Sequence, residues 1–430
     1  MDASPPRDFT APPRIRLDVR SRVVERLNVV LPHLDAGQAF GGISTAMELA
    51  RVLAAHYSRV RLISQMPLPA PEAMFDIPAP GLEGDIGHRH QGLPGGRDEK
   101  ESIADGDSFS ASGAPQETVS LVDGASLPCH RAEVFLCTHW STVGVWEAYD
   151  LAMRQAGFAA PDFYSFIQDF EPDFLPQGPA RARALAGYTH GERCRAVINS
   201  IELARFLSEA GLRFARTHTL KPSLNPELAR YLDARGWRLT KPRPDPLVIL
   251  VYGRPATPRN RFQEATKGLA LHLDSLSEGE RRRTLCLSAG QPHPDILLGP
   301  NAVLKSLGKL SLQRYAALLE QTHVGLSLMA SPHPSYPPLE MALFGLMTVT
   351  NRHAGKDLAG THPGIVSIAA PEPAEVARGL ALAREMARAA PAVQKAVLPL
   401  SLSPLPWGEN LRNLGIEPIR APGLNFVDHL

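Results

Sequence analysis

Between residues 324 and 350 the sequence switches from a strand pattern to a helix pattern and back within a short span. The apolar run Val324–Met329 predicts a buried strand. After the loop Ser331–Ser335, a short helix is expected from about Pro337, because proline is favoured in a first helical turn. Gly345 is expected to end this helix, and Leu346–Thr350 predicts the next strand. This order is typical of an α/β protein built on a parallel sheet.

The loop 331–335 follows the carboxyl end of a predicted parallel strand, which is where open α/β sheets bind ligands. The exposed amides and the positive dipole end of the next helix suit a diphosphate. Glu340 is expected in the first helical turn. It could accept a hydrogen bond from a sugar hydroxyl or only favour the helix dipole, and local spacing leaves both uses open.

A second unit of the same kind stands near the start of the chain. Leu27–Leu31 predicts a strand, a helical pattern runs from Gly41 to Leu53, and Val60–Ser64 predicts the next strand. Gly41 and Gly42 could let a phosphate approach the backbone, or could serve only tight packing of the helix on the strand. The full GxGxxG pattern is absent.

The composition excludes several classes of protein. Apolar residues make up 44% of the 430 residues and the formal net charge is +1, which is typical of a globular protein and gives no basic excess for nucleic acid. The four cysteines show no CxxC spacing and predict reduced thiols. No run of eighteen apolar residues and no signal-peptide pattern is present, so we expect a cytoplasmic protein without a transmembrane segment.

Changes in composition predict the domain organisation. We expect a flexible extension over 1–26, a first domain over 27–240 with a loop insertion at about 67–128, a second domain over 247–400, and a tail over 401–430 that could pack back on the first domain. The prolines of Lys241–Pro246 suit an interdomain linker. In the insertion, Asp105 and Asp107 imitate a metal-binding DxD pair, but they do not follow a strand, and we expect no metal site.

Polar residues follow three further predicted strands. His139 follows the strand 132–137 and is a candidate base or phosphate donor, because its pKa lies near neutrality, although a lone histidine is more often structural. Asp169 and Glu171 follow Phe163–Ile167 and could orient a hydroxyl nucleophile or cap the next helix. The third strand, Arg195–Asn199, also ends in a polar residue. Such residues are expected along one edge of a sheet. In the second half of the chain, Gly253 and Arg254 follow the strand 247–252.

Several stretches together resemble the WsaF-type rhamnosyltransferases of S-layer glycan assembly, which have the GT-B fold. The resemblance covers about residues 27–370, except the insertion. The stretches that carry it are Phe40–Thr45, Phe166–Pro172, Val197–Ser200, Tyr252–Pro255, Leu307–Ser311 and Gly325–Ala342. It implies two Rossmann-like domains whose parallel sheets face each other across an interdomain cleft.

The resemblance implies a nucleotide-sugar donor, dTDP-L-rhamnose, on the second domain and a saccharide or lipid-linked glycan acceptor against the first. The wider group, the retaining glycosyltransferases of family 4, needs no metal and no other cofactor. A lipid-linked acceptor would bring the enzyme to the inner membrane face. The implied chemistry is transfer of the sugar with the leaving phosphate as proton acceptor, so His139, Asp169 and Glu171 would orient the acceptor.

The family's site residues carry over only in part. Its Arg and Lys clamp on the diphosphate maps onto Arg254 and Asn260, so that Lys309 or Arg259 would supply the second charge, with Gly253 beside them. Its two glutamates, eight residues apart, map onto Pro332 and Glu340, and only the second is retained. The residues that could replace the first are His333, Ser335 and Tyr336, and Glu340 would hold the ribose or deoxyribose.

Two other functions compete with transfer. Pro332 and Asn260 would fit a nucleotide-sugar or glycan-binding homologue without activity, whereas Arg254 and Glu340 argue against it. A Rossmann-type oxidoreductase would need GxGxxG and an acidic residue at the end of the second strand, but Val60–Ser64 is followed by Gln65.

Overall fold

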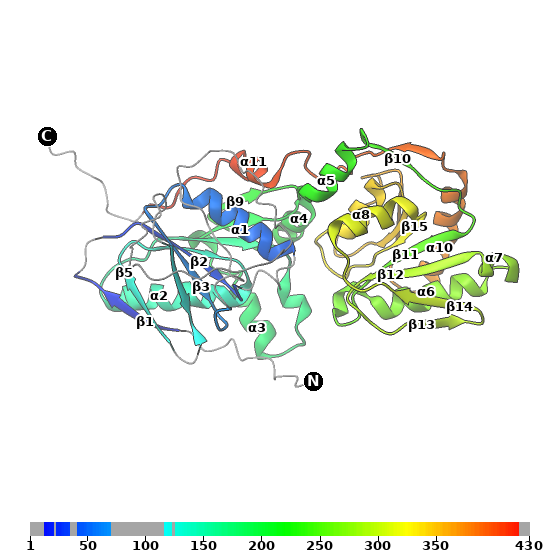
Figure 1. Cartoon of the computed structure of the whole chain (residues 1–430). Helices are drawn as coiled ribbons and strands as arrows, with labels where there is room; N and C mark the ends of the chain where they lie inside the picture. Colours follow the sequence, from blue (N-terminus) through cyan, green and yellow to red (C-terminus); the bar gives the residue numbers. More distant parts are fainter. Residues whose placement is uncertain (1–12, 21–22, 35–40, 70–115, 123–124, 421–430) are drawn as a thin grey trace, which may run out of the picture. The chain divides into compact units, whose positions relative to one another are not determined.

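The computed structural model describes residues 13–20, 23–34, 41–69, 116–122 and 125–420 (Figure 1). In the described part, two seven-stranded sheets dominate, with the strand orders β4-β3-β2-β6-β7-β8-β9 and β13-β14-β12-β11-β15-β16-β17. The chain forms two compact units, a smaller one that includes Pro13–Leu136 and Ala148–Pro161, and a larger one that includes Cys137–Glu147 and Asp162–Glu417. This division does not follow the expected boundary at 240–247, because the segment from Asp162 onward groups with the second sheet.

The first sheet alternates strands with helices, as the sequence predicts. Its strands are β2 (Arg26–Leu31), β3 (Arg59–Ser64), β4 (Gln116–Ser120), β6 (Val134–Cys137), β7 (Phe163–Ile167), β8 (Cys194–Ile198) and β9 (Arg216–Thr219). The helices are α1 (Gly41–Ala54), α2 (Val143–Gln155), α3 (Pro179–Ala186) and α4 (Ile201–Glu209). The 3-10 turns are η4 (Trp140–Thr142), η5 (Glu171–Phe174) and η6 (Gly191–Arg193). β2 pairs with β3, β3 with β4, β7 with β8 and β8 with β9, all in parallel.

Two predicted loop regions contain strands. Strand β1 (Arg14–Asp18) lies in the expected flexible extension and pairs in parallel with β5 (Ser126–His130). β4 also begins before residue 128, where the sequence predicts an insertion without strands. Both differences arise because these short segments carry polar or mixed residues, and their strand conformation depends on a partner distant in sequence. Asp105 and Asp107 lie outside the described residues.

The second sheet is mostly parallel, with one antiparallel edge strand, β13. Its strands are β11 (Leu247–Gly253), β12 (Thr284–Gly290), β13 (Ile296–Gly299), β14 (Ala302–Ser306), β15 (Val324–Leu326), β16 (Met347–Asn351) and β17 (Ile365–Ile368). The helices of this region are α5 (Pro226–Asp233), α6 (Phe262–Asp274), α7 (Glu278–Arg282), α8 (Leu312–Gln321), α9 (Tyr336–Leu343) and α10 (Pro373–Ala389). A 3-10 turn, η7 (Pro258–Asn260), follows β11.

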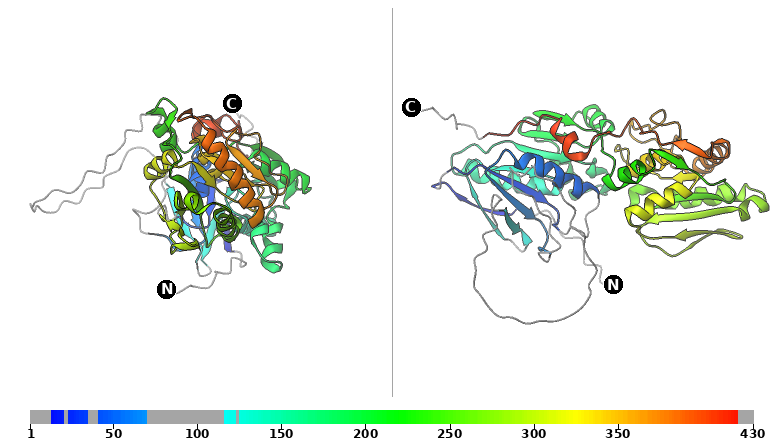
Figure 2. Two further views of the ribbon diagram at one scale, coloured as in Figure 1. Left: turned by 90° about the vertical axis from the view of Figure 1, so that its right-hand side faces the viewer. Right: turned by 45° about the horizontal axis from the view of Figure 1, so that its top comes forward.

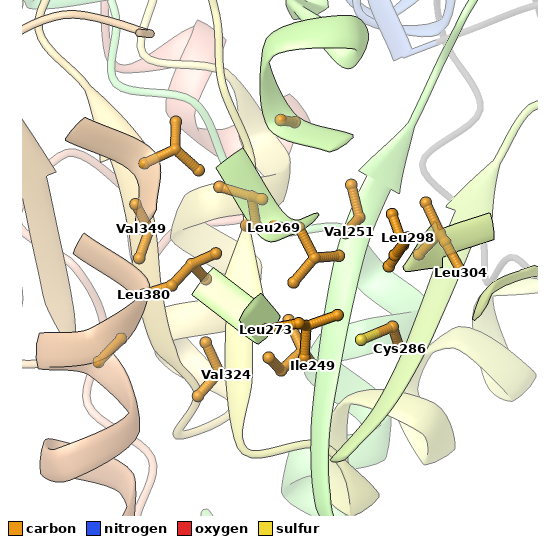
Figure 3. Close-up of a cluster of buried hydrophobic side chains, with 14 of the residues drawn as sticks. Ile249, Val251, Leu269, Leu273, Cys286, Leu298, Leu304, Val324, Val349 and Leu380 are labelled. Atoms are coloured by element: carbon orange, nitrogen blue, oxygen red, sulfur yellow. The ribbon is translucent and has the colours of Figure 1, made fainter. Parts of the chain in front are cut away.

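Helices cover both faces of this sheet. Because successive side chains of a strand point to opposite faces, Ile249 and Val251 of β11 pack with Leu269 of α6 and Leu380 of α10 (Figure 3). The intervening Leu250 packs with residues of α8 and α9 instead. The long orange helix of Figure 2, α10, lies against α6, β15, β16 and β17. Two helical layers around a parallel sheet confirm the predicted α/β class.

One short strand precedes the second sheet in the sequence and another follows it. β10 (Arg238–Thr240) lies just before it and β18 (Val393–Lys395) lies just after it, and the two pair antiparallel. The tail then forms α11 (Trp407–Arg412), where Asn410 donates to the backbone oxygen of Lys221 at 2.7 Å. Further along, Glu417 accepts a hydrogen bond from the Tyr164 hydroxyl through its backbone oxygen.

The region around residues 324–345 follows the prediction with two corrections. Helix α9 begins at Tyr336, close to the expected start, and Gly345 has the left-handed φ of 80° of a helix stop. However, Glu340 lies in the second turn of α9 and not the first. β15 also ends at Leu326 rather than at Met329, because the Met329 amide leaves the strand ladder and donates to a side chain, that of Asn351.

Candidate functional site

The loop after β15 is held in place from β16 and the turn beyond it. The Met329 amide donates to Oδ1 of Asn351 at 2.7 Å, and Nδ2 of Asn351 donates to the Met329 oxygen at 3.2 Å. Nζ of Lys356, a buried side chain, donates to the same oxygen at 2.9 Å. Burial lowers the pKa of Lys356 to about 8, although Asp169 and Glu202 act in the opposite direction. Asn351 and Lys356 therefore fix the start of the loop that leads to Glu340.

The same loop is bonded to the residues that follow β7. The Ser331 hydroxyl donates to Oδ1 of Asp169 and accepts from the His333 amide at 3.0 Å. Nδ1 of His333 accepts from the Ser335 amide at 3.0 Å. Burial raises the pKa of Asp169 to about 6, even though Ser331 lowers it, and burial lowers the pKa of His333 to about 3. His333 is therefore neutral at physiological pH.

The start of α9 has fewer amides available to a diphosphate than the sequence predicts. The amides of His333 and Ser335 already donate to side chains of the loop. Pro337 and Pro338, in the first turn of the helix, have no N–H group. Proline is favoured in the first turn, but it cannot donate a hydrogen bond to an anion. The dipole of α9 therefore remains, whereas most N–H donors of its first turn are lost.

Glu340 and Tyr315 form a second ionisable pair in this region. Burial raises the pKa of Glu340 to about 7, and the Tyr315 phenol acts to lower it. The Tyr315 hydroxyl is buried and has no partner with good hydrogen-bond geometry in the described part of the chain. A carboxyl group that titrates near neutrality can both donate to and accept from a ligand hydroxyl.

Three loops at the carboxyl ends of β11, β12 and β14 are bonded together. The Gln291 amide donates to the Gly253 oxygen at 2.7 Å, and the Gly290 amide donates to the Gly308 oxygen at 3.0 Å. The close packing leaves no room for a side chain at position 253, since a Cβ on Gly253 would lie 2.0 Å from Oγ of Ser288. The loops that carry Arg254 and Lys309 are thereby held next to each other. The Arg254 side chain is half-buried and the Lys309 side chain is exposed.

The turn η7 brings Arg259 to the acidic residues after β7. The Arg259 guanidinium lies over the Phe174 ring, 4.5 Å from its centroid, and its charge lowers the pKa of both Asp169 and Glu171. The Arg259 oxygen accepts from the Ala330 amide at 2.7 Å, which ties η7 to the loop after β15. Two buried atoms, Nε of Arg259 and Oδ1 of Asn260, have no hydrogen-bond partner among the described residues. Such atoms can be satisfied by water or by a bound polar ligand.

His139 and Glu171 lie together near the end of β6. Nε2 of His139 is 3.8 Å from Oε1 of Glu171, whose Oε2 accepts from the Trp140 amide at 2.9 Å. Nδ1 of His139 is 2.8 Å from Oγ of Ser141, and the Tyr188 hydroxyl lies 3.3 Å from Oε2 of Glu171. Burial raises the pKa of Glu171 to about 7 and lowers that of His139 to about 4. Four of these residues line one small cavity, namely His139, Trp140, Glu171 and Tyr188.

The structure therefore groups most of the predicted residues within the larger unit. Ser331 joins Asp169 to the loop of His333, Ser335 and Tyr336, and the ring of Tyr336 lies 5.8 Å from that of His333. Gly41 and Gly42 open α1 in the smaller unit. In the described part of the chain, no group of three or more His, Cys, Asp or Glu side chains could hold a metal ion.

Asn351 and Lys356 were not predicted from the sequence. Asn351 follows the predicted strand 346–350, so the rule that polar residues cluster at strand ends could have found it. No sequence pattern identifies Lys356 as a site residue, because lysine side chains are usually exposed and the sequence does not indicate that this one is buried. Within the described ranges, no helix is both long and apolar enough to cross a membrane.

Comparison with known proteins supports the resemblance for part of the chain. Residues 247–381 match the family model described as WsaF, C-terminal domain. The O-antigen biosynthesis protein RfbC of Myxococcus xanthus is 30% identical over 211 residues, which are 49% of this chain and 15% of the relative. The chain thus spans only a small part of the length of that curated relative.

The comparison with solved structures concerns the fold alone. Sucrose-phosphate synthase from Thermosynechococcus elongatus has 13% identity and a TM-score of 0.50, with 91% of this chain and 94% of that chain covered. WaaG, a glycosyltransferase involved in lipopolysaccharide biosynthesis, has 14% identity and a TM-score of 0.47, with 90% and 94% covered. The expected GT-B class of two Rossmann-like α/β domains is confirmed at the level of the fold.

Proposed function

We propose that this chain is a glycosyltransferase that moves L-rhamnose from dTDP-L-rhamnose to a saccharide or lipid-linked glycan in surface polysaccharide synthesis. The match of residues 247–381 to the WsaF C-terminal domain carries the proposal. The likeness to an O-antigen biosynthesis protein supports the same pathway class. The position of Arg254 and Glu340 at the carboxyl edge of the second sheet supports a donor site there.

The chemistry needs positive charge where the nucleoside diphosphate leaves. Arg254 and Lys309 supply it in this proposal, because their loops are bonded to each other through Gly290 and Gly308. Arg259, with a free Nε donor in the described structure, adds a third cation. Three cations can replace a metal ion as the stabilising charge, which is the reason to propose metal-independent transfer.

The acceptor hydroxyl needs orientation more than a strong base if the sugar is transferred with retention. The leaving phosphate then takes the acceptor proton as the new glycosidic bond forms and the bond to phosphate breaks. Asp169, Glu171 and His139 can orient the hydroxyl, since the first two are acceptors when ionised and neutral His139 can accept or donate. Glu340 is assigned to a hydroxyl of the donor.

Calorimetric titration tests the donor. The protein is titrated with dTDP-L-rhamnose, dTDP, UDP-glucose and GDP-mannose in the presence of EDTA, alongside Arg254→Ala and the control Arg314→Ala, an exposed arginine of α8. We expect selective binding of dTDP-L-rhamnose, weakened at least tenfold, or about 1.4 kcal/mol, by Arg254→Ala alone. Tighter binding of another nucleotide sugar would reject rhamnose, and no binding at all would reject the donor site.

The replacement of the first family glutamate by Pro332 favours one other function, a binding protein without activity. Release of dTDP in the presence of saccharide and lipid-linked acceptors separates the two. Donor binding without dTDP release from any acceptor would support the binding protein. Where product forms, the anomeric configuration measured by NMR decides between retention and inversion.

A further inference from the structure

A second cavity lies at the opposite edge of the second sheet from Arg254. Its volume is about 180 Å³. It lies where β11, β15 and β16 begin, whereas Arg254 follows the end of β11. The lining residues are Lys241–Pro244, His323, Gly345, Ala387, Arg388, Ala390–Ala392 and Gln394. Three of them are cations and none is a carboxylate.

Lys241 is the buried cation of this cavity. Its Nζ donates to the backbone oxygens of Leu319 at 2.6 Å and Thr322 at 2.9 Å, near the end of α8. An ammonium group has three N–H donors, so one remains after these bonds. No carboxylate of the described residues lies within ion-pair distance of Lys241, which is about 5% exposed. Burial lowers its pKa to about 7, which reflects a charge without a close counter-ion.

The nearest acidic influence on Lys241 comes from Glu320, and this carboxylate has other partners. Its Oε2 accepts from the Tyr231 hydroxyl at 2.5 Å and from Nε of Arg235 at 3.2 Å. His323 cannot balance the charge either, since its Nδ1 accepts from the Val248 amide and its burial lowers its pKa. When Lys241 is protonated, these neighbours do not neutralise its charge.

Two arginines add to the positive charge of the lining. Arg243 is exposed, and no ion pair involves it within the described ranges. Nη2 of Arg388 lies 3.4 Å from Oε1 of Glu280 and its Nη1 lies 3.6 Å from Oε1 of Glu385, so the charge of Arg388 is partly balanced. Gly345 permits the close packing of the lining, since a Cβ there would lie 2.6 Å from Oε1 of Gln394 and 3.1 Å from Cε of Lys241.

We propose that this cavity is a binding site for a small phosphate-bearing anion, held by Lys241, Arg243 and Arg388. A phosphate suits a lining with three cationic side chains because its oxygens accept charge-assisted hydrogen bonds from lysine and arginine. The site is separate from the proposed donor site. It lies against Lys241–Pro244 and Ala390–Gln394, the segments that join β10 and β18 to the second sheet. An anion there would bridge the two connections through which the chain enters and leaves this sheet.

The test titrates the full chain calorimetrically with inorganic phosphate at constant ionic strength. Arg243→Gln and Lys241→Met remove a cation from the lining, and Arg238→Gln removes an exposed cation of β10 that does not line the cavity. We expect saturable binding that both lining variants weaken at least tenfold and that Arg238→Gln and Arg254→Ala leave unchanged. Arg243→Gln alters only an exposed side chain, so it decides the result even if Lys241→Met fails to fold.

Amide hydrogen exchange locates the site. Phosphate should protect segments within 241–246 and 387–394. Glycerol 3-phosphate as a second titrant distinguishes a phosphorylated metabolite, which should bind more tightly than the free ion, from inorganic phosphate itself. The proposal is overturned by absence of saturable binding, by equal weakening in Arg238→Gln, or by loss of binding in Arg254→Ala, which would assign the phosphate to the proposed donor site.

Discussion

The Ser331 hydroxyl donates a hydrogen bond to Oδ1 of Asp169, and both groups are buried. Ser331 belongs to the loop after β15, and Asp169 follows β7, so the bond joins residues 162 positions apart in the chain. The same hydroxyl accepts from the His333 amide, so that one side chain fixes a carboxylate and the course of a loop together. Asp169 titrates near pH 6 in this environment because burial outweighs the effect of the hydroxyl.

Ser331→Ala should raise the pKa of Asp169 further, because the hydroxyl stabilises the ionised carboxylate. If ionised Asp169 orients the acceptor, the acidic limb of the kcat/KM profile should move up by about one pH unit. Ser331→Thr keeps the hydroxyl and should restore the wild-type profile. A profile that Ser331→Ala leaves unmoved would exclude this use of Asp169.

Glu340→Gln should change how stability depends on pH. The pKa of Glu340 is raised in the folded protein from 4.5 to about 7, so the folded state binds the proton more tightly than the unfolded state. The free energy of unfolding of the wild type should therefore fall as the pH rises from about 4.5 to 7, by an amount on the order of 2 kcal/mol for this group.

Glu340→Gln should lose this part of the pH dependence, measured by urea denaturation at several pH values. Glu409→Gln, an exposed glutamate of α11, serves as the control and should leave the dependence intact. Parallel curves for Glu340→Gln and the wild type would show that burial does not raise the pKa of Glu340.

Asn351→Leu should destabilise the protein by about 2–4 kcal/mol, because it leaves the buried amide and oxygen of Met329 with fewer partners. Hydrogen exchange of residues 329–336 should accelerate, since Asn351 fixes the start of that loop. Asn351→Asp keeps the acceptor for the Met329 amide and should cost less. Equal stability of the two variants would mean that the amide does not depend on Asn351.

Gly253→Ala should cost about 1–3 kcal/mol, because its Cβ would overlap Oγ of Ser288 at 2.0 Å. In the double variant with Ser288→Ala the nearest remaining atoms would be Nε2 of His293 and Cβ of Ser288, both at 3.4 Å. We therefore expect Ser288→Ala to recover part of the loss, measured as a coupling energy in a double-mutant cycle. Additive losses would place the strain elsewhere in the loop.

Local patterns predicted most of the second sheet. Val324 and Met347 open strands where the apolar runs indicate them, and Ser311 caps α8 through its hydroxyl. These signals depend on periodicity and on residues a few positions apart. β15 ends earlier than predicted because the Met329 amide donates to a side chain 22 residues away. A local sequence pattern does not indicate a partner at that distance.

The sequence predicted which residues belong to the candidate site better than it predicted the contacts between them. Polar residues at strand ends identified Asp169, Glu171 and His139, and the structure brings Glu171 and His139 together. The loss of amide donors at Pro337 and Pro338 follows from the sequence alone, because proline has no N–H group. Burial of Lys356 depends on packing around a turn, which the sequence does not indicate.

The antiparallel pairing of β10 with β18 sets Arg238 opposite Lys395, so the chain leaves for the second sheet and returns from it at neighbouring points. Everything between these strands is, in topological terms, an insertion whose two ends meet. A segment with this arrangement can be excised or exchanged by joining two adjacent chain ends, with no need to span the protein. The match of residues 247–381 to a family model of its own falls entirely inside that segment. The segment between β10 and β18 is therefore built as a replaceable module, which could be exchanged while the rest of the chain keeps its connectivity.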